Sequence, residues 1–231
     1  MKICGLQKLT LLDFPSKVAC TVFLGGCNFR CPFCYNAPLV FLERDEITEW
    51  PEEKFFRFLD TRKGTLDGVC ITGGEPLMSD LRDFARKIKE RGFLLKLDTN
   101  GSFPERLKDL IDRNLVDYVA MDVKNTLEKY PETIGRADFD PSPVARSIAL
   151  LKEGRVDYEF RTTVSRELHK PEDLMELARY LRGAKRYFLQ SYSDAGEQIG
   201  DEALSAYSKE ELERMLKIIK EEIPEAELRG V

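Results

Sequence analysis

The sequence contains one histidine, His169, and one tryptophan among its 231 residues. A single histidine excludes catalytic machinery that needs two histidines, and it removes most zinc sites that mix cysteine with histidine. No apolar run approaches the roughly 20 residues that cross a bilayer, and residues 1–10 lack the basic and apolar stretches of a secretory signal. The net charge of −5 leaves no global basic field for a nucleic acid. We therefore expect a cytoplasmic protein without a membrane partner, and the acidic balance argues against a nucleic-acid partner.

The composition, with 42% hydrophobic and 33% charged residues, is that of a folded chain with a sizeable core. The length favours one domain, and no linker-like or low-complexity stretch divides the sequence. We expect a single domain over residues 1–231. It would comprise an N-terminal arm at 1–17, a core at 18–190, and a loop with a C-terminal helix at 191–231.

Short β-rich apolar segments alternate with segments of helical periodicity along the core. The predicted strands are 18–24, 68–72, 93–97, 116–121, 158–164 and 186–190. The predicted helices are 51–62, a helix capped by Ser79 and ended by Gly92, 104–113, 143–152, 171–182 and 208–222. This alternation implies a parallel sheet with helices outside it. Such a sheet is either open and doubly wound, or it is an incomplete barrel with six of the usual eight units. We predict an α/β fold of the second kind, an incomplete (β/α)6 TIM-like barrel.

Three of the six cysteines lie within eight residues, directly after the first predicted strand. Their spacing is Cys-x3-Cys-x2-Cys, formed by Cys27, Cys31 and Cys34. Clustered thiols in a large chain without a secretory signal are typical of metal or redox sites. Three thiolates can hold three corners of a cubane iron–sulfur cluster and leave its fourth iron open to a ligand. A zinc site is the alternative, and its fourth ligand would have to be Cys20 or the distant His169.

The phrase Cys27-x3-Cys31-x-Phe33-Cys34 resembles the motif of the radical S-adenosylmethionine (SAM) superfamily. The resemblance implies a [4Fe-4S] cluster on the three cysteines, whose open iron binds the amino and carboxylate groups of SAM. One electron from the cluster would split the S–C5′ bond, and the resulting 5′-deoxyadenosyl radical would abstract a hydrogen atom.

Polar phrases follow the next predicted strands and extend the resemblance. Gly73-Gly74-Glu75-Pro76 resembles the family's Gly-Gly-Glu motif, which holds the SAM ammonium group. Asp98-Thr99-Asn100-Gly101 and Met121-Asp122-Val123-Lys124 resemble phrases of glycyl-radical-enzyme activases. There, the residues that match Asp98, Thr99, Asp122 and the Ala120 carbonyl hold a monovalent cation, Na or K. The alternative is that both aspartates cap helices and that Asn100-Gly101 is a turn. The other residues that the resemblance places near SAM are Asn36, Asn100, Lys124, Thr163, Gln190 and Tyr192.

The phrase Leu12-Asp13-Phe14-Pro15-Ser16-Lys17 resembles a subgroup of anaerobic ribonucleoside-triphosphate reductase activating proteins. Pyruvate formate-lyase activases carry a histidine where this sequence has Ser193, so the likeness to them is more distant. The resemblance implies a glycyl-radical enzyme as protein substrate, and a flavodoxin or ferredoxin as electron donor. Two alternatives stay open. The radical could act on a small molecule or a tRNA nucleoside, or the chain could be a non-catalytic iron–sulfur protein for electron transfer or scaffolding.

Overall fold

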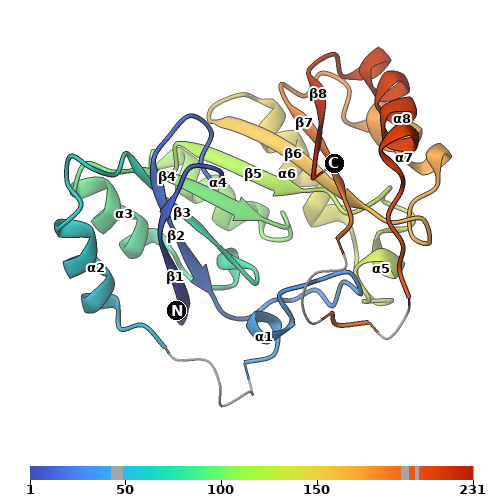
Figure 1. The fold of residues 1–231 in the computed structure, drawn as a ribbon. Coiled ribbons are helices and arrows are strands. Elements are labelled where there is room, and N and C mark those ends of the chain that lie inside the picture. Colours follow the sequence, from blue (N-terminus) through green and yellow to red (C-terminus); the bar gives the residue numbers. More distant parts are fainter. Residues whose placement is uncertain (43–48, 194–197, 201–202, 231) are drawn as a thin grey trace. The chain divides into compact units, whose positions relative to one another are not determined.

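The computed structural model describes residues 1–42, 49–193, 198–200 and 203–230. The chain divides into two compact units, which are described in turn. The first comprises Met1–Asn28, Asn36–Thr99 and Glu105–Val119. The second comprises Phe29–Tyr35, Asn100–Pro104 and Ala120–Val231. The strands follow the sheet order β1-β2-β3-β4-β5-β6-β7-β8, which is also their order along the chain (Figure 1).

The first unit holds four strands, in which β1 runs antiparallel to β2 while β2, β3 and β4 are parallel. The strands are β1 (Ile3–Thr10), β2 (Ala19–Leu24), β3 (Gly68–Gly73) and β4 (Leu94–Thr99). The helices are α1 (Ala37–Val40), α2 (Glu52–Asp60), the 3-10 turn η1 (Pro76–Met78), α3 (Arg82–Glu90) and α4 (Pro104–Asp112). Phe55 of α2 and Phe84 of α3 are buried with ring centroids 5.3 Å apart, so aromatic contacts join these helices.

The second unit holds the parallel strands β6 (Asp157–Val164), β7 (Tyr187–Ser191) and β8 (Ala226–Arg229), while β5 (Tyr118–Asp122) crosses the division between the units. Its helices are α5 (Tyr130–Thr133), α6 (Ser142–Lys152), α7 (Pro171–Tyr180) and α8 (Lys209–Glu222). A reciprocal cap begins α8, because the Ser208 hydroxyl accepts from the Glu211 N–H and the Glu211 carboxylate accepts from the Ser208 N–H.

The predicted parallel α/β fold is confirmed, and all six predicted strands are present as β2 to β7. Two strands were missed. β1 lies in the segment assigned to an arm, and three of its residues, Gln7, Lys8 and Leu9, are exposed, so its apolar pattern is weak. β8 lies in the segment assigned to a loop and helix, and only four residues form it. The prediction that Ser79 caps a helix is wrong, since α3 begins at Arg82, whose N–H donates to the Asp80 carboxylate.

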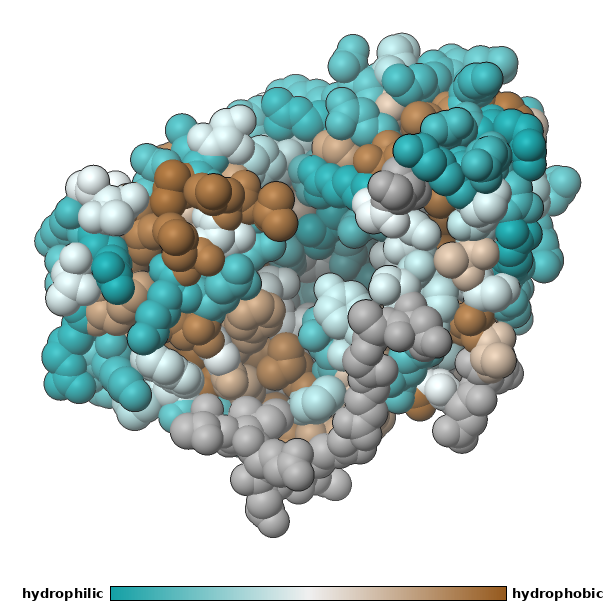
Figure 2. All heavy atoms as spheres, viewed as in Figure 1, coloured by the Kyte–Doolittle hydropathy of each residue, from teal (hydrophilic) through white to brown (hydrophobic). Residues whose placement is uncertain are grey.

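Three leucines, Leu9, Leu11 and Leu12, lie exposed where β1 ends, and Figure 2 shows hydrophobic atoms gathered there. Among the residues that the structure describes, no helix is both long and apolar enough to span a membrane. Parts of the predicted loop after residue 191 (194–197 and 201–202) lie outside the described residues.

Candidate functional site

The end of β3 lies against the segment that leads into Cys27, and two glycines permit the approach. The Gly74 N–H donates to the Leu24 carbonyl at 2.8 Å, and the Glu75 N–H donates to the Gly26 carbonyl at 2.7 Å. A Cβ on Gly73 would lie 2.2 Å from the Leu24 oxygen, and a Cβ on Gly74 would lie 2.0 Å from the Gly26 oxygen. No side chain fits at such distances, so the close approach of these two segments requires glycine at both positions, Gly73 and Gly74.

Glu75 joins the end of β3 to the end of β4. Its carboxylate is 2% exposed, and Oε1 accepts from the Leu77 N–H at 2.9 Å and from the Thr99 hydroxyl at 2.8 Å. The structure therefore brings together two of the predicted site residues, Glu75 and Thr99. A buried carboxylate is an acceptor, and it suits a ligand that presents N–H groups, such as an ammonium.

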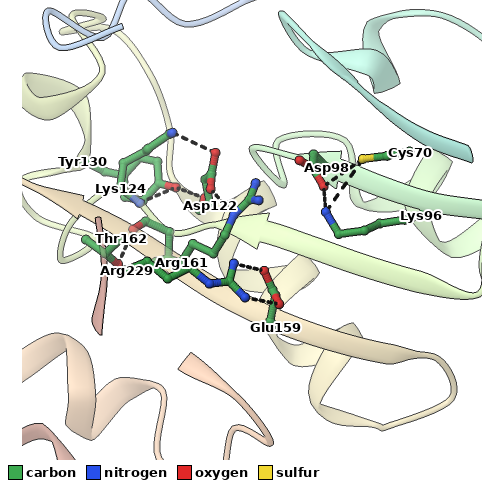
Figure 3. A network of polar contacts seen from close by, with 11 residues as sticks. Cys70, Lys96, Asp98, Asp122, Lys124, Tyr130, Glu159, Arg161, Thr162 and Arg229 are labelled. Carbon is green, nitrogen blue, oxygen red and sulfur yellow. Dashed lines mark hydrogen bonds and ion pairs between the residues drawn. The ribbon is translucent and has the colours of Figure 1, made fainter. Parts of the chain in front are cut away.

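A second polar group of the first unit lies on β3 and β4 (Figure 3). The ammonium of Lys96 pairs with Oδ1 of Asp98, and its Nζ lies 3.8 Å from the sulfur of Cys70. Lys96 is only 2% exposed. Sequence reasoning missed this lysine, although a signal was present in the form of a charged residue inside the apolar run Leu94–Leu97.

The cysteine loop is divided between the units, with Cys27 in the first and Cys31 and Cys34 in the second. In the second unit the Cys34 N–H donates to the Cys31 carbonyl at 3.0 Å, which closes a turn. Buried aromatic residues precede this turn and lie within it. Phe29 lies edge-on to Phe139 with centroids 5.0 Å apart, and Phe33 is 7% exposed. Both aromatic side chains hold the segment that carries Cys31 and Cys34.

None of the six cysteines, which all lie in described segments, forms a disulfide. The described residues contain no group of three or more His, Cys, Asp or Glu side chains arranged to hold a metal ion. The donor set itself, three thiols on one short loop, fits an iron–sulfur cluster. It fits zinc poorly, because one candidate for a fourth ligand, Cys20, is buried in β2, and the other, His169, is already hydrogen-bonded. Burial raises the pKa of the Cys20 thiol to about 12, and both ring nitrogens of His169 are hydrogen-bonded to main-chain atoms.

Asp122, Lys124 and Arg161 form a charged group in the second unit (Figure 3). Arg161 Nε donates to Asp122 Oδ1 at 2.8 Å, and Lys124 Nζ donates to Asp122 Oδ2 at 3.1 Å. Burial works to raise the pKa of Asp122, but the two cations outweigh it and hold this pKa at about 2. Burial works to lower the pKa of Lys124, and the neighbouring Asp122 outweighs it and raises this pKa. Asp122 is therefore ionised at neutral pH. Arg161 was not among the predicted site residues, although its place on β6, two residues before Thr163, pointed to it.

The strands β6, β7 and β8 align further polar residues. Thr163 lies opposite Gln190 in the ladder, and Gln190 lies opposite Arg229. Arg229 donates to both oxygens of the buried Glu159, at 2.7 and 3.1 Å. The carbon of its guanidinium lies 3.3 Å from the centroid of the Phe188 ring. The pair of the buried Glu159 and the partly exposed Arg229 was missed because β8 was missed.

Three predicted residues lie in local caps or turns. Asn36 stands at the N-cap position of α1, where its side chain makes no capping hydrogen bond. Asn100 is 6% exposed, and its side-chain oxygen accepts from the Ser102 N–H at 3.0 Å and from the Ser102 hydroxyl at 2.6 Å, so the turn predicted there is present. Tyr192 is 5% exposed, and its hydroxyl is hydrogen-bonded to the Gln198 side chain. Contact of these residues with SAM stays a prediction.

A family model described as "Radical SAM superfamily" matches residues 21–181 of the chain. A Methanocaldococcus jannaschii protein with the provisional name glycyl-radical enzyme activating enzyme is 33% identical over 82% of this chain and 79% of its own length. The pyruvate formate-lyase-activating enzyme of Streptococcus mutans is 25% identical over 85% of this chain and 80% of its own length.

A 7-carboxy-7-deazaguanine synthase of Thermococcus kodakarensis is also similar, with 24% identity over 73% of this chain and 72% of its own length. Among solved structures, QueE from Escherichia coli superposes with a TM-score of 0.62 over 99% of this chain and 93% of that chain. Their sequences are 16% identical, so this likeness concerns the fold alone.

Proposed function

The chain belongs to the radical SAM superfamily, and on that premise we propose that it activates a glycyl-radical enzyme. The observation that carries the proposal is the 33% identity, over 82% of the chain, to a protein named for that activity. Cys27, Cys31 and Cys34 would hold the [4Fe-4S] cluster. With one electron from a reduced donor protein, the bound cluster and SAM would supply a 5′-deoxyadenosyl radical that takes a hydrogen atom from a glycine Cα of the partner. The reaction leaves 5′-deoxyadenosine, methionine and a glycyl radical.

The chain's own residues would bind and orient SAM. Glu75, a buried acceptor held by Thr99, would receive the SAM ammonium group. The pKa of Lys124 is raised, so this lysine stays positively charged and would attract the carboxylate group of SAM. The remaining proposed contacts are Asn36, Gly73, Gly74, Asp98, Asn100, Asp122, Thr163, Gln190 and Tyr192. Residues 1–231 would work as one radical SAM domain in the cytoplasm, with a flavodoxin or ferredoxin as electron donor.

The first test is reductive cleavage of SAM. The full chain is reconstituted with iron and sulfide without oxygen, reduced with dithionite and incubated with SAM. We expect 5′-deoxyadenosine from the wild type and none from Cys31→Ala. Cys4→Ala is the matched control, because it removes a thiol of β1 and leaves the loop cysteines intact. A fully loaded protein that forms no 5′-deoxyadenosine would contradict the enzyme assignment and favour an electron-transfer or scaffold protein.

The second test concerns the target. Glycyl-radical proteins encoded near this gene are expressed with glycine that carries deuterium on Cα. We expect one of them to transfer deuterium into 5′-deoxyadenosine and to gain a glycyl radical signal in electron paramagnetic resonance. SAM cleavage that no such protein stimulates, and from which no deuterium is recovered, would contradict the proposed activity.

The likeness to a 7-carboxy-7-deazaguanine synthase favours a second candidate, in which the radical acts on a small molecule. The two candidates differ in what stimulates SAM cleavage. A protein-free extract would stimulate it if the substrate is a small molecule, and a purified partner protein would stimulate it if the chain is an activase.

A further inference from the structure

Lys96 is a buried lysine on β4, and β4 brings its side chain to Asp98. The two residues are two positions apart on a strand, so both side chains leave the same face. The ammonium of Lys96 pairs with Asp98 Oδ1, and the two side chains are 2% and 16% exposed. Cys70 lies opposite Lys96 in the ladder of β3 and β4, and its thiol lies 3.8 Å from Asp98 Oδ1 (Figure 3).

A buried ammonium is stable only when an anion compensates for its lost hydration, and a buried carboxylate has the same need for a cation. Lys96 and Asp98 meet each other's need. The Lys96 ammonium therefore already lies beside Asp98 Oδ1. This oxygen belongs to a carboxylate that was expected to bind a monovalent cation.

The second predicted cation ligand, Asp122, is compensated in the same way within its own unit. Arg161 occupies its Oδ1 at 2.8 Å, and Lys124 occupies its Oδ2 at 3.1 Å. An added sodium or potassium ion would lie within a few ångströms of an ammonium or guanidinium, and like charges at that range repel in a site with little water. The residues present therefore do not fit a monovalent cation.

We propose that the Lys96 ammonium supplies at Asp98 the positive charge that a bound monovalent cation would otherwise supply. Lys96 is then a positioning residue, because its ion pair holds the Asp98 carboxylate in place, and the protein works without sodium or potassium. The effect of Lys96 on SAM binding rests on the proposed function. The expected indifference to sodium and potassium depends only on the folded chain.

The test compares sodium, potassium and tetramethylammonium chlorides at equal ionic strength. Tetramethylammonium is too large to enter the space that removal of the Lys96 side chain would leave beside the Asp98 carboxylate. For the cluster-reconstituted wild type, we expect the same melting temperature in all three salts. Lys96→Ala leaves Asp98 buried with a space beside it. We expect this variant to melt lower in tetramethylammonium and to regain several degrees in sodium or potassium.

Lys89→Ala is the matched control, because Lys89 also pairs with a partly buried aspartate, Asp117, at 2.6 Å. We expect it to show no preference among the salts. If the role of Lys96 were only structural, Lys96→Ala would lower the melting temperature without making it depend on which of the three salts is present. A wild type that itself gains stability from sodium or potassium, or a folded Lys96→Ala variant without salt selectivity, would overturn the proposal.

Should Lys96→Ala fail to fold, the double variant Lys96→Met with Asp98→Asn keeps the test decisive, because it removes both charges together. It should fold and be indifferent to the three salts. A sodium or potassium preference in this variant would show that the cation binds elsewhere and would overturn the assignment to Asp98.

SAM binding is measured on the same proteins by equilibrium dialysis. We expect the wild-type Kd to be equal in the three salts, and the Kd of Lys96→Ala to improve at least tenfold when potassium or sodium replaces tetramethylammonium. Failure of the wild type to bind SAM at all would count against the proposed function. The melting temperatures would still decide the role of Lys96.

Discussion

The ring of His169 holds the main chain of Lys124, with its Nε2 2.7 Å from the Lys124 carbonyl oxygen. The Ser165 N–H donates to Nδ1 at 3.3 Å, so the ring proton lies on Nε2 and donates to Lys124. His169 is fully buried, and its ring lies edge-on to Phe33, with centroids 6.4 Å apart. The sequence offered this residue only as a fourth ligand of the alternative zinc site, and it lies in the loop before α7. The structure shows that the loop is anchored at the base of the Asp122 and Lys124 group.

Removal of this contact should destabilise the second unit. His169→Leu leaves the Lys124 carbonyl and the Ser165 N–H without their ring partner, and an unsatisfied buried polar group costs about 1–3 kcal/mol. We expect a loss of at least that size in urea unfolding. His169→Gln retains a side-chain N–H donor and should recover part of it. Equal losses for both variants would show that packing, and not the hydrogen bond, matters.

The same residue should make stability depend on pH. Burial lowers the pKa of His169 below its ordinary value of 6.5, although its hydrogen bonds to the main chain oppose the shift. The unfolded chain therefore binds the proton first as the pH falls. The contribution of the buried, neutral His169 to stability is therefore complete above about pH 6.5 and is lost as the pH falls below that value. We expect the free energy of unfolding to fall between pH 7.5 and 5.5 in the wild type and to change less in His169→Gln. Because the chain has no other histidine, identical slopes would contradict this assignment.

Gly74 should tolerate no side chain. In Gly74→Ala the Cβ would lie 2.0 Å from the Gly26 oxygen, so the end of β3 would have to move away from the segment that carries Cys27. We expect a loss of about 1–3 kcal/mol in unfolding free energy from this overpacking, and a lower iron content after reconstitution. Gly5→Ala is the control, because a Cβ there meets only ordinary contacts at 3.5 Å or more. A neutral Gly74→Ala would show that the close approach is not required.

The hydroxyl of Thr99 should stabilise the buried carboxylate of Glu75. Thr99→Val keeps the shape of the side chain and removes the donor at 2.8 Å, which should cost about 1–3 kcal/mol. Thr99→Ser retains the donor and should unfold close to the wild type. The measurement is urea unfolding of all three proteins, followed by SAM binding. If valine and serine behave alike, the hydrogen bond contributes nothing to Glu75.

Much of the fold was readable in the sequence because its signals are local. Apolar segments such as Val69–Ile71, bounded by glycines, predict buried parallel strands wherever they occur. Cys27, Cys31 and Cys34 lie on one short loop, so their spacing alone indicates their joint use. The edge strands β1 and β8 escaped prediction, because an exposed or very short strand has little apolar pattern and depends on its neighbour for pairing.

The alternating α/β architecture, the cysteine loop and the Gly-Gly-Glu motif were all predictable, since each depends on residues close together in the chain. The partners that compensate the buried charges depend instead on the tertiary fold. It brought Arg161 to Asp122 across 39 positions and Arg229 to Glu159 across 70. Lys96 and Asp98 are neighbours on one strand, yet the burial that makes their pairing necessary comes from the surrounding fold. The neighbouring residues in the sequence do not show whether a charged side chain is buried, because the tertiary fold sets how much of its hydration is lost.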